Sequence, residues 1–138
     1  MKKNEVKKNN KGFSLVELIV VIAIMAVLVG VLAPQFMKYV EKSREATDIQ
    51  NAEQVASALK VYYADDESLS SNVSINITTT GITSGGAITD AGLGGLKLKS
   101  QKWDGNKITV VFDHTTGQTT TTGEAPHYYA NGQKKSGS

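Results

Sequence analysis

The feature that most constrains this chain is an apolar run from Leu18 to Ala33, which directly follows the acidic residue Glu17. Residues 13–33 contain only two clearly polar side chains, Ser14 and Glu17. As a helix they would span roughly 30 Å, the thickness of the hydrocarbon core of a bilayer. A carboxylate at membrane depth is costly, so it normally has a partner or a function. The run therefore predicts a membrane helix with a functional glutamate near its start.

A basic segment precedes the apolar run. Residues 1–12 hold five lysines and one glutamate, and the next lysine is Lys38. This asymmetry predicts a cytoplasmic N-terminus and a C-terminal part outside the membrane. Removing residues 1–12 from a chain with 15 basic and 13 acidic residues leaves 10 and 12, so the net charge changes from +2 to −2. Bulk charge therefore gives no support for a specific nucleic-acid partner.

Two ordinary kinds of N-terminal segment compete with a processed membrane helix. A secretory signal has a shorter apolar core and a small-residue cleavage site at the far end of that core. Here residues 31–34 offer only a weak site, and the small residue Gly12 stands before the run instead. A plain, uncut signal anchor is the second alternative.

The junction Lys11-Gly12-Phe13-Ser14-Leu15-Val16-Glu17-Leu18 resembles the class III leader junction of type IV pilins and pseudopilins. The resemblance implies that a prepilin peptidase cuts between Gly12 and Phe13 and that the new amine of Phe13 is methylated. It also implies that Glu17, the fifth mature residue, acts in filament assembly. The match covers about the first 35 residues closely.

Elementary electrostatics supports a role for Glu17 beside this resemblance. Cleavage would expose a positive amine on Phe13, at a helix N-terminus that already carries partial positive charge. Glu17, one turn away, could neutralise its own amine in the membrane or the amine of a neighbouring subunit in a filament. Such a pairing is stronger in a low-dielectric core than in water. The alternative is that Glu17 only reaches the lipid headgroups at the membrane edge.

The helix is expected to continue past Pro34. Proline removes the hydrogen bond to the carbonyl of Gly30, so a kink is expected near residues 30–34. The alternative is a helix that ends at Ala33, because the residue before a proline disfavours helix. Apolar and small residues then recur every three or four positions up to about Ala64. The expected inner stripe is Phe36, Val40, Ser43, Ala46, Ile49, Ala52, Ala56, Leu59 and Tyr63.

The opposite face of this helix is expected to be solvated. It carries Lys42, Arg44, Glu45, Asp48, Gln50, Glu53 and Lys60. The i,i+4 pair of Arg44 and Asp48 should favour the helix. Tyr62 and Tyr63, at the end of the stripe, are expected to be core aromatics.

From Ser68 onward the composition shifts to Ser, Thr, Asn and Gly, with alternating apolar residues that predict strands. Strands are expected at residues 72–79, around Leu96 and Leu98, at 107–113 and at 118–122. The glycine-rich segment 81–95 is expected to be a loop, and Asp104-Gly105 a hairpin turn. The polar residues 131–138 are expected to fray. The fold class is thus α+β, with a long N-terminal helix packed against a small antiparallel sheet, as in pilins.

Catalytic and metal-binding patterns are not found in the sequence. The chain has no cysteine, so thiol and iron–sulfur chemistry are excluded. His114 and His127 are far apart with no acidic partner at ligand spacing, so a surface position is expected for both. Residues 65–67 are acidic but lack the spacing of a calcium loop. No enzyme, metal or cofactor is predicted.

These observations divide the chain into a cleaved leader (1–12), a transmembrane and assembly half-helix (13–34), an amphipathic half-helix (35–66) and a β-rich head (67–138). The predicted function is a structural subunit, of the major-pilin type, of a type IV pilus in adhesion, motility or biofilm. Expected partners are further copies of the chain, the prepilin peptidase, the assembly platform, minor pilins and the membrane. The alternatives are a pseudopilin of a secretion or DNA-uptake apparatus, and a membrane-anchored surface binding protein that never polymerises.

Overall fold

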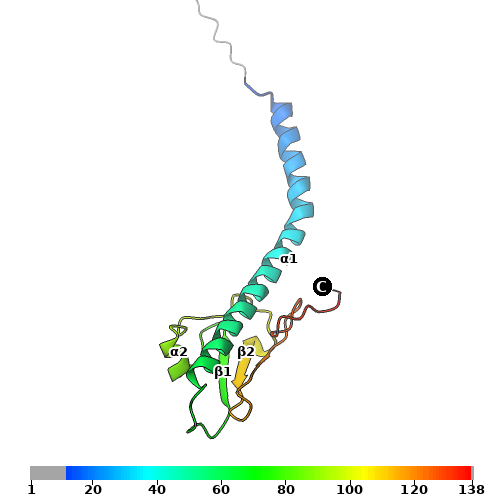
Figure 1. Cartoon of the computed structure of the whole chain (residues 1–138). Coiled ribbons are helices and arrows are strands. Elements are labelled where there is room, and N and C mark those ends of the chain that lie inside the picture. The colour runs from blue at the N-terminus through cyan, green and yellow to red at the C-terminus, as the bar shows by residue number, and fades with distance from the viewer. Residues whose placement is uncertain (1–11, 138) are drawn as a thin grey trace, which may run out of the picture. The chain divides into compact units, whose positions relative to one another are not determined.

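The computed structural model describes residues 12–137 (Figure 1). Its elements, in chain order, are α1 (Leu15–Tyr62), β1 (Val73–Thr78), α2 (Gly86–Asp90), a 3₁₀ turn η1 (Asp104–Asn106), β2 (Lys107–Phe112) and β3 (Thr119–Thr122). The predicted α+β, pilin-like class is confirmed. The chain divides into two compact units between Met37 and Lys38, and α1 contributes to both.

Helix α1 is continuous through Gly30 and Pro34, so the alternative of an end at Ala33 is wrong. It ends two residues earlier than the expected Ala64, although the amide of Tyr63 still donates to the carbonyl of Leu59 at 3.0 Å. Pro34 has no N–H to donate to the carbonyl of Gly30, but the residues on both sides of it remain helical. The expected kink remains a prediction.

The sheet has the order β1-β2-β3, and both pairs are antiparallel. Ile75 lies opposite Val110, which lies opposite Thr121 on the other side. Along β1 and β2 buried residues alternate with more exposed ones, as the period of a pleated strand requires. The three strands expected at 72–79, 107–113 and 118–122 are thus confirmed.

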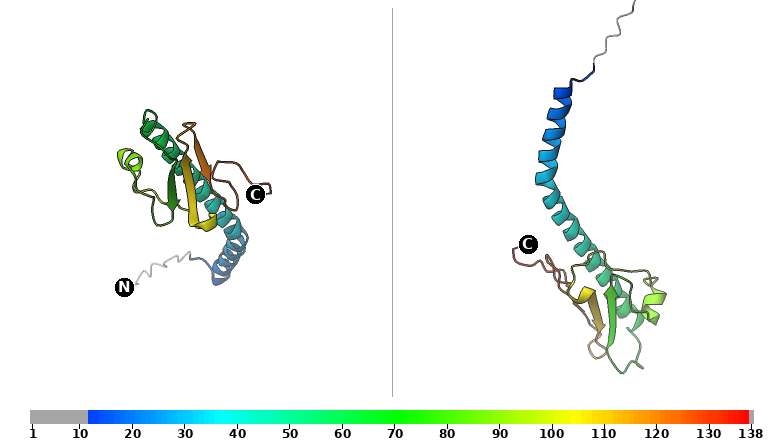
Figure 2. Two further views of the ribbon diagram at one scale, coloured as in Figure 1. Left: turned by 90° about the horizontal axis from the view of Figure 1, so that it is seen from below. Right: turned by 180° about the vertical axis from the view of Figure 1, so that it is seen from behind.

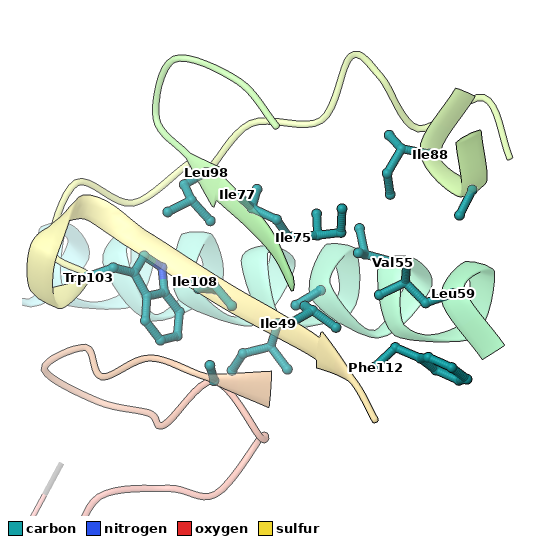
Figure 3. Packing of buried hydrophobic residues seen from close by; sticks show 14 of the residues in the cluster. Ile49, Val55, Leu59, Ile75, Ile77, Ile88, Leu98, Trp103, Ile108 and Phe112 are labelled. Carbon is teal, nitrogen blue, oxygen red and sulfur yellow. The ribbon is translucent and has the colours of Figure 1, made fainter. Parts of the chain in front are cut away.

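The second unit, residues 38–137, has one apolar core between α1 and the inner face of the sheet of the head. Its strands lie side by side along α1, and α2 lies beside the C-terminal end of that helix (Figure 2). Trp103 and Leu98 close one end of this core, while Leu59 and Phe112 lie toward the other (Figure 3). Tyr63 packs against Phe112 with ring centroids 5.6 Å apart. Tyr62, expected in the core, is instead 44% exposed.

The strand expected around Leu96 and Leu98 is wrong, because these residues are irregular. The amide of Leu98 donates to the carbonyl of Thr78 at 2.9 Å, but the two amides after it donate to a side chain of α1 instead of a strand. Without a strand before it, Asp104-Gly105 is not a hairpin turn. It forms the 3₁₀ turn that leads into β2, with Gly105 at φ 64°.

Segment 81–95 is also more ordered than the expected loop. Ile82 forms a bridge with Ile77, and α2 buries Ala87 and Ile88 against the core. A side chain at Gly86 would collide with the hydroxyl of Tyr62, so glycine permits the close approach of α2 to α1.

The polar tail was expected to fray from about residue 131. Over the described residues it forms backbone hydrogen bonds with the segment before it. The amide of Tyr129 donates to the carbonyl of Gln133, and the amide of Lys135 donates to the carbonyl of His127, both at 2.9 Å.

Candidate processing and assembly segment

The junction predicted for cleavage lies at the start of the described chain. Most of the predicted leader, residues 1–11, falls outside the described residues. Gly12 and Phe13 precede α1 in an extended stretch, and the side chain of Phe13 is 82% exposed. No heavy atom lies near the position that a Cβ on Gly12 would take. Among the described residues nothing packs against this junction, and cleavage between Gly12 and Phe13 stays a prediction.

A reciprocal pair of hydrogen bonds begins α1. The amide of Glu17 donates to the hydroxyl of Ser14 at 3.3 Å, and the amide of Ser14 donates to Oε2 of Glu17 at 3.2 Å. This is a capping box, which satisfies two backbone donors that a helix start would leave unpaired. Sequence reasoning gave Glu17 a different partner and missed this one. The signal was present as Ser-x-x-Glu before an apolar run.

The capping box aims the carboxylate of Glu17 back along the chain. Its acceptor atom binds the amide of Ser14, the residue that follows Phe13. A carboxylate held there is within one residue of the atom that would become the charged amine after cleavage between Gly12 and Phe13. The pairing of Glu17 with such an amine stays a prediction.

The helix beyond the capping box exposes a continuous apolar surface. An 18-residue window of α1 has a mean hydropathy of 3.1 and no buried residue, which makes α1 the one helix in the described chain long and apolar enough to cross a membrane. All its large apolar residues between Leu15 and Leu32 are at least half exposed. Soluble monomers rarely expose so much contiguous apolar area, so this surface requires lipid or other protein.

Gly30 and Pro34 lie inside this exposed part of α1. Nothing lies within 4 Å of the position that a Cβ on Gly30 would occupy, so glycine is not required there by packing. Its effect would instead be to soften the turn whose carbonyl Pro34 cannot bond. The role of both residues in a kink remains a prediction.

The second half of α1 buries an aspartate that was expected on the solvated face. Asp48 is fully buried and accepts hydrogen bonds from the amides of Lys99 and Ser100 at 2.6 and 2.9 Å. It also accepts one from the indole Nε1 of Trp103 at 2.9 Å. The expected pair of Arg44 and Asp48 is therefore wrong. Asp48 is buried because the segment 99–103 supplies three donors, which offset the cost of removing a carboxylate from water.

Two further carboxylates of α1 hold the head in the same way. Glu45, also fully buried, accepts from the amide of His127 at 3.1 Å and lies 3.0 Å from its Nδ1. Glu41 accepts from the hydroxyl of Ser100. We call Glu41, Glu45 and Asp48 the carboxylate clasp. It corrects two expectations, since Glu45 is not solvated and His127 does have an acidic partner.

The described residues 12–137 offer no group of three or more metal-ligating side chains suited to an ion. His114 lies in an exposed turn, where its backbone amide donates to Oδ1 of Asn72 at 3.1 Å. Every buried polar side-chain atom in this part of the chain has a hydrogen-bond partner. The buried polar groups of the head therefore serve to hold its segments together. The large exposed apolar surface lies on the N-terminal half of α1.

The fold, a long apolar N-terminal helix with a small antiparallel sheet, is pilin-like. Residues 7–33 match the family model described as the prokaryotic N-terminal methylation motif. The chain is 39% identical over 80 residues to "Prepilin peptidase-dependent protein A" of Clostridium perfringens, with 57% of each chain covered. It is 27% identical over 67 residues to "Type IV major pilin protein PilA" of Myxococcus xanthus, covering 49% of this chain and 30% of that protein.

These matches confirm the resemblance of the chain to the type IV pilin and pseudopilin family. The alignments cover less than two thirds of each of these relatives. No solved structure gives a significant match.

Proposed function

We propose that this chain is a structural subunit of a type IV pilus, of the major-pilin type. A prepilin peptidase cuts it between Gly12 and Phe13, and it polymerises through the N-terminal half of α1. Before assembly it is anchored in the membrane with residues 1–12 in the cytoplasm and the head outside. Afterwards it lies in an extracellular filament with other copies and minor pilins, for adhesion, motility or biofilm.

The observation that carries this proposal is an apolar helix surface that no other described residue covers, with one carboxylate, Glu17, at its start. The methylation motif over residues 7–33 coincides with that surface. Lipid can cover the apolar side chains, but a carboxylate at this depth favours a charged partner. An amine created on Phe13 of a neighbouring copy is such a partner. This supports packing of the same helices against one another.

A pseudopilin of a secretion or DNA-uptake apparatus shares every N-terminal feature named above. The Clostridium relative's name, which mentions dependence on the peptidase and no pilus, is consistent with either use. Recovery of the mature chain in filaments sheared from cells favours the pilin. Its retention in the cell envelope favours the pseudopilin, and uncut protein in the membrane favours a surface binding protein that never polymerises.

The decisive experiment is mass spectrometry of the sheared fraction, combined with two single variants. We expect a mature chain that begins at methylated Phe13. Glu17→Ala should leave processing intact and abolish filaments, because no carboxylate remains to meet a neighbour's amine.

Ser14→Ala is the matched control for that variant, because it removes the helix cap and keeps the Glu17 carboxylate. We expect filaments from Ser14→Ala. Equal loss of filaments from both variants would show that Glu17 acts only as a cap. Normal filaments from Glu17→Ala would overturn the assembly role.

A further inference from the structure

The charges of the head are separated along α1. We define the near end as the part that packs around residues 38–48 of α1, and the far end as the part around residues 57–62. Leu98 and Trp103 belong to the near end, and Phe112 to the far end (Figure 3). Of the ten basic residues in positions 38–137, only Lys60 lies at the far end. The other nine are Lys38, Lys42, Arg44, Lys97, Lys99, Lys102, Lys107, Lys134 and Lys135.

Hydrogen bonds bring the distant basic residues to the near end. The amide of Lys99 donates to Asp48, and the amide of Lys102 donates to the hydroxyl of Ser100, which itself binds Glu41. These bonds hold segment 97–102 beside Lys38 and Lys42 of α1. We call Lys38, Lys42, Lys97, Lys99 and Lys102 the basic collar.

The far end has the opposite sign. Residues 65–67 supply three acids directly after α1, Asp113 follows the strand residue that packs on Tyr63, and Asp90 lines a groove with Val61. Five acids against Lys60 leave a formal charge of −4 at the far end. At the near end, nine basic residues leave +4 against five acids, which are Glu41, Glu45, Asp48, Asp104 and Glu124. Glu53 lies between the two ends and is counted in neither.

The clasp carboxylates do not cover the basic collar; of the other two near-end acids, both exposed, Glu124 pairs with Lys135. Glu45 and Asp48 are fully buried and saturated with donors from the head, and Glu41 binds Ser100. Lys38, Lys97, Lys99 and Lys102 are exposed. The clasp thus places its negative charge inside the fold, while the positive charge of the same region faces outward.

We infer that the basic collar is a binding surface for anionic lipid headgroups, on which the head rests before assembly. This rests on the membrane anchoring proposed above. In the sequence, Lys38 and Lys42 follow Ala33, where the apolar run ends, by only five and nine positions. The polar layer of a bilayer is roughly 5–8 Å thick on each side, and charges act over about 8 Å at physiological salt.

The acidic far end strengthens the same orientation. Twenty-four residues separate Lys38 from Tyr62, so the far end of α1 lies roughly 36 Å further along the helix. An anionic surface attracts the near end and repels the far end. Each basic residue close to such a surface is worth about a fivefold gain in binding. Three of the five collar lysines come from segment 97–102, so the collar exists only when the folded head holds that segment against α1.

Amine labelling of the full chain in vesicles tests this inference. The chain is reconstituted into phosphatidylcholine vesicles and into vesicles that also contain phosphatidylglycerol, and flotation verifies insertion in both. An amine-reactive ester is then applied, and peptide mass spectrometry gives a rate for each lysine. We expect rates at Lys97, Lys99 and Lys102 to fall about fivefold or more with phosphatidylglycerol. Lys60 is the internal control and should keep its rate.

High salt should remove the protection, because the attraction is screened. A double variant, Lys99→Gln with Lys102→Gln, should weaken protection of Lys97, while Lys60→Gln should not. Equal rates in the two lipids would overturn the inference. Protection in phosphatidylcholine that grows with protein density would also overturn it. That result would mean that the collar binds the acidic far end of a second copy instead of lipid. Failure to float with either vesicle would overturn the anchoring and this inference together.

Discussion

The two halves of α1 use carboxylates in opposite settings. Near its start, Glu17 accepts one backbone amide and lies on a helix surface with no buried residue in its apolar window. In the second half of the same helix, Asp48 accepts three donors and is fully buried. The chemistry of the acceptor is the same, but Asp48 is enclosed by the fold and Glu17 is exposed.

This difference holds for the two halves of α1 as a whole. The head satisfies its buried polar atoms through contacts between residues far apart in the sequence. The N-terminal half satisfies only its own helix start and leaves its apolar side chains exposed. Substitutions in the clasp should therefore change stability, whereas substitutions at the helix start should change local order and assembly.

The largest effect on stability is expected from Asp48→Ala. It would leave the amides of Lys99 and Ser100 and the indole of Trp103 buried without their acceptor, at a cost of about 3–5 kcal/mol in the free energy of unfolding. Denaturant unfolding of the full chain in detergent, followed by Trp103 fluorescence, measures this. Glu53→Ala, on the exposed face, is the matched control. A loss below about 1 kcal/mol for Asp48→Ala, the net value of one ordinary hydrogen bond, would contradict the clasp.

A smaller loss is expected from His127→Ala. The variant removes the ring nitrogen beside Glu45 but keeps the backbone amide that also binds this carboxylate. We expect a loss of about 1–3 kcal/mol in the same unfolding assay. His114→Ala, in an exposed turn, should change stability less. A loss greater than that of Asp48→Ala would reverse the proposed ranking of the two contacts.

Ser14→Ala tests whether a change at the N-terminal end of α1 leaves the stability of the head unchanged. Loss of an N-cap hydroxyl costs about 1 kcal/mol, and here the cost should stay local to the first turn. Hydrogen exchange in detergent should show faster exchange of the Glu17 amide, with the amide of Val27 as an unaffected reference. Head unfolding should not change. An altered unfolding midpoint would mean that the two halves are energetically coupled.

The smallest effect is expected from the half-buried Asp113 at the far end. Hydrogen bonds from the hydroxyl and amide of Thr115, and then from the amide of Thr116, lower the pKa of Asp113 below its ordinary value of 3.8. A lowered pKa in the folded state means that this contribution is present at neutral pH and is lost as pH falls below about 4. Asp113→Asn should make stability less dependent on pH in that acid range. Unfolding midpoints across the acid range, with Asp65→Asn as a reference, measure this.

Much of the fold was predictable because it depends on local periodicity. Three strands and the long helix follow from alternation and from the recurrence of apolar residues. The clasp was not predictable by the same rule, which assigns acidic residues to solvent. Its members continue the observed buried face of α1, however, since the positions 41, 45, 48, 52, 55 and 59 are spaced by four and three residues in turn. That spacing was the available signal. The expected stripe was wrong at its start, where Phe36 is exposed.

The remaining misses share one cause. The expected strand at Leu96 and Leu98 fails because Asp48, fifty residues earlier, accepts the amides that follow. His127 was expected at the surface because Glu45 lies 82 residues away along the chain. Such pairings depend on tertiary structure, so residue type and spacing alone do not reveal them. At the N-terminal segment, by contrast, the motif lies within a few consecutive residues and was readable directly.

The carboxylate clasp also has a kinetic consequence. Its bonds join residues separated by 51 to 82 positions, so closing them requires large loops to be ordered first. If the first half of α1 is already helical in a bilayer, the helix can extend into its second half before the head folds. Glu41, Glu45 and Asp48 would then lie on one face of a formed helix. Segments 99–103 and 127–135 would then dock on a rigid template rather than on a fluctuating coil. We expect the head to fold faster on a membrane-held α1 than as a detached fragment.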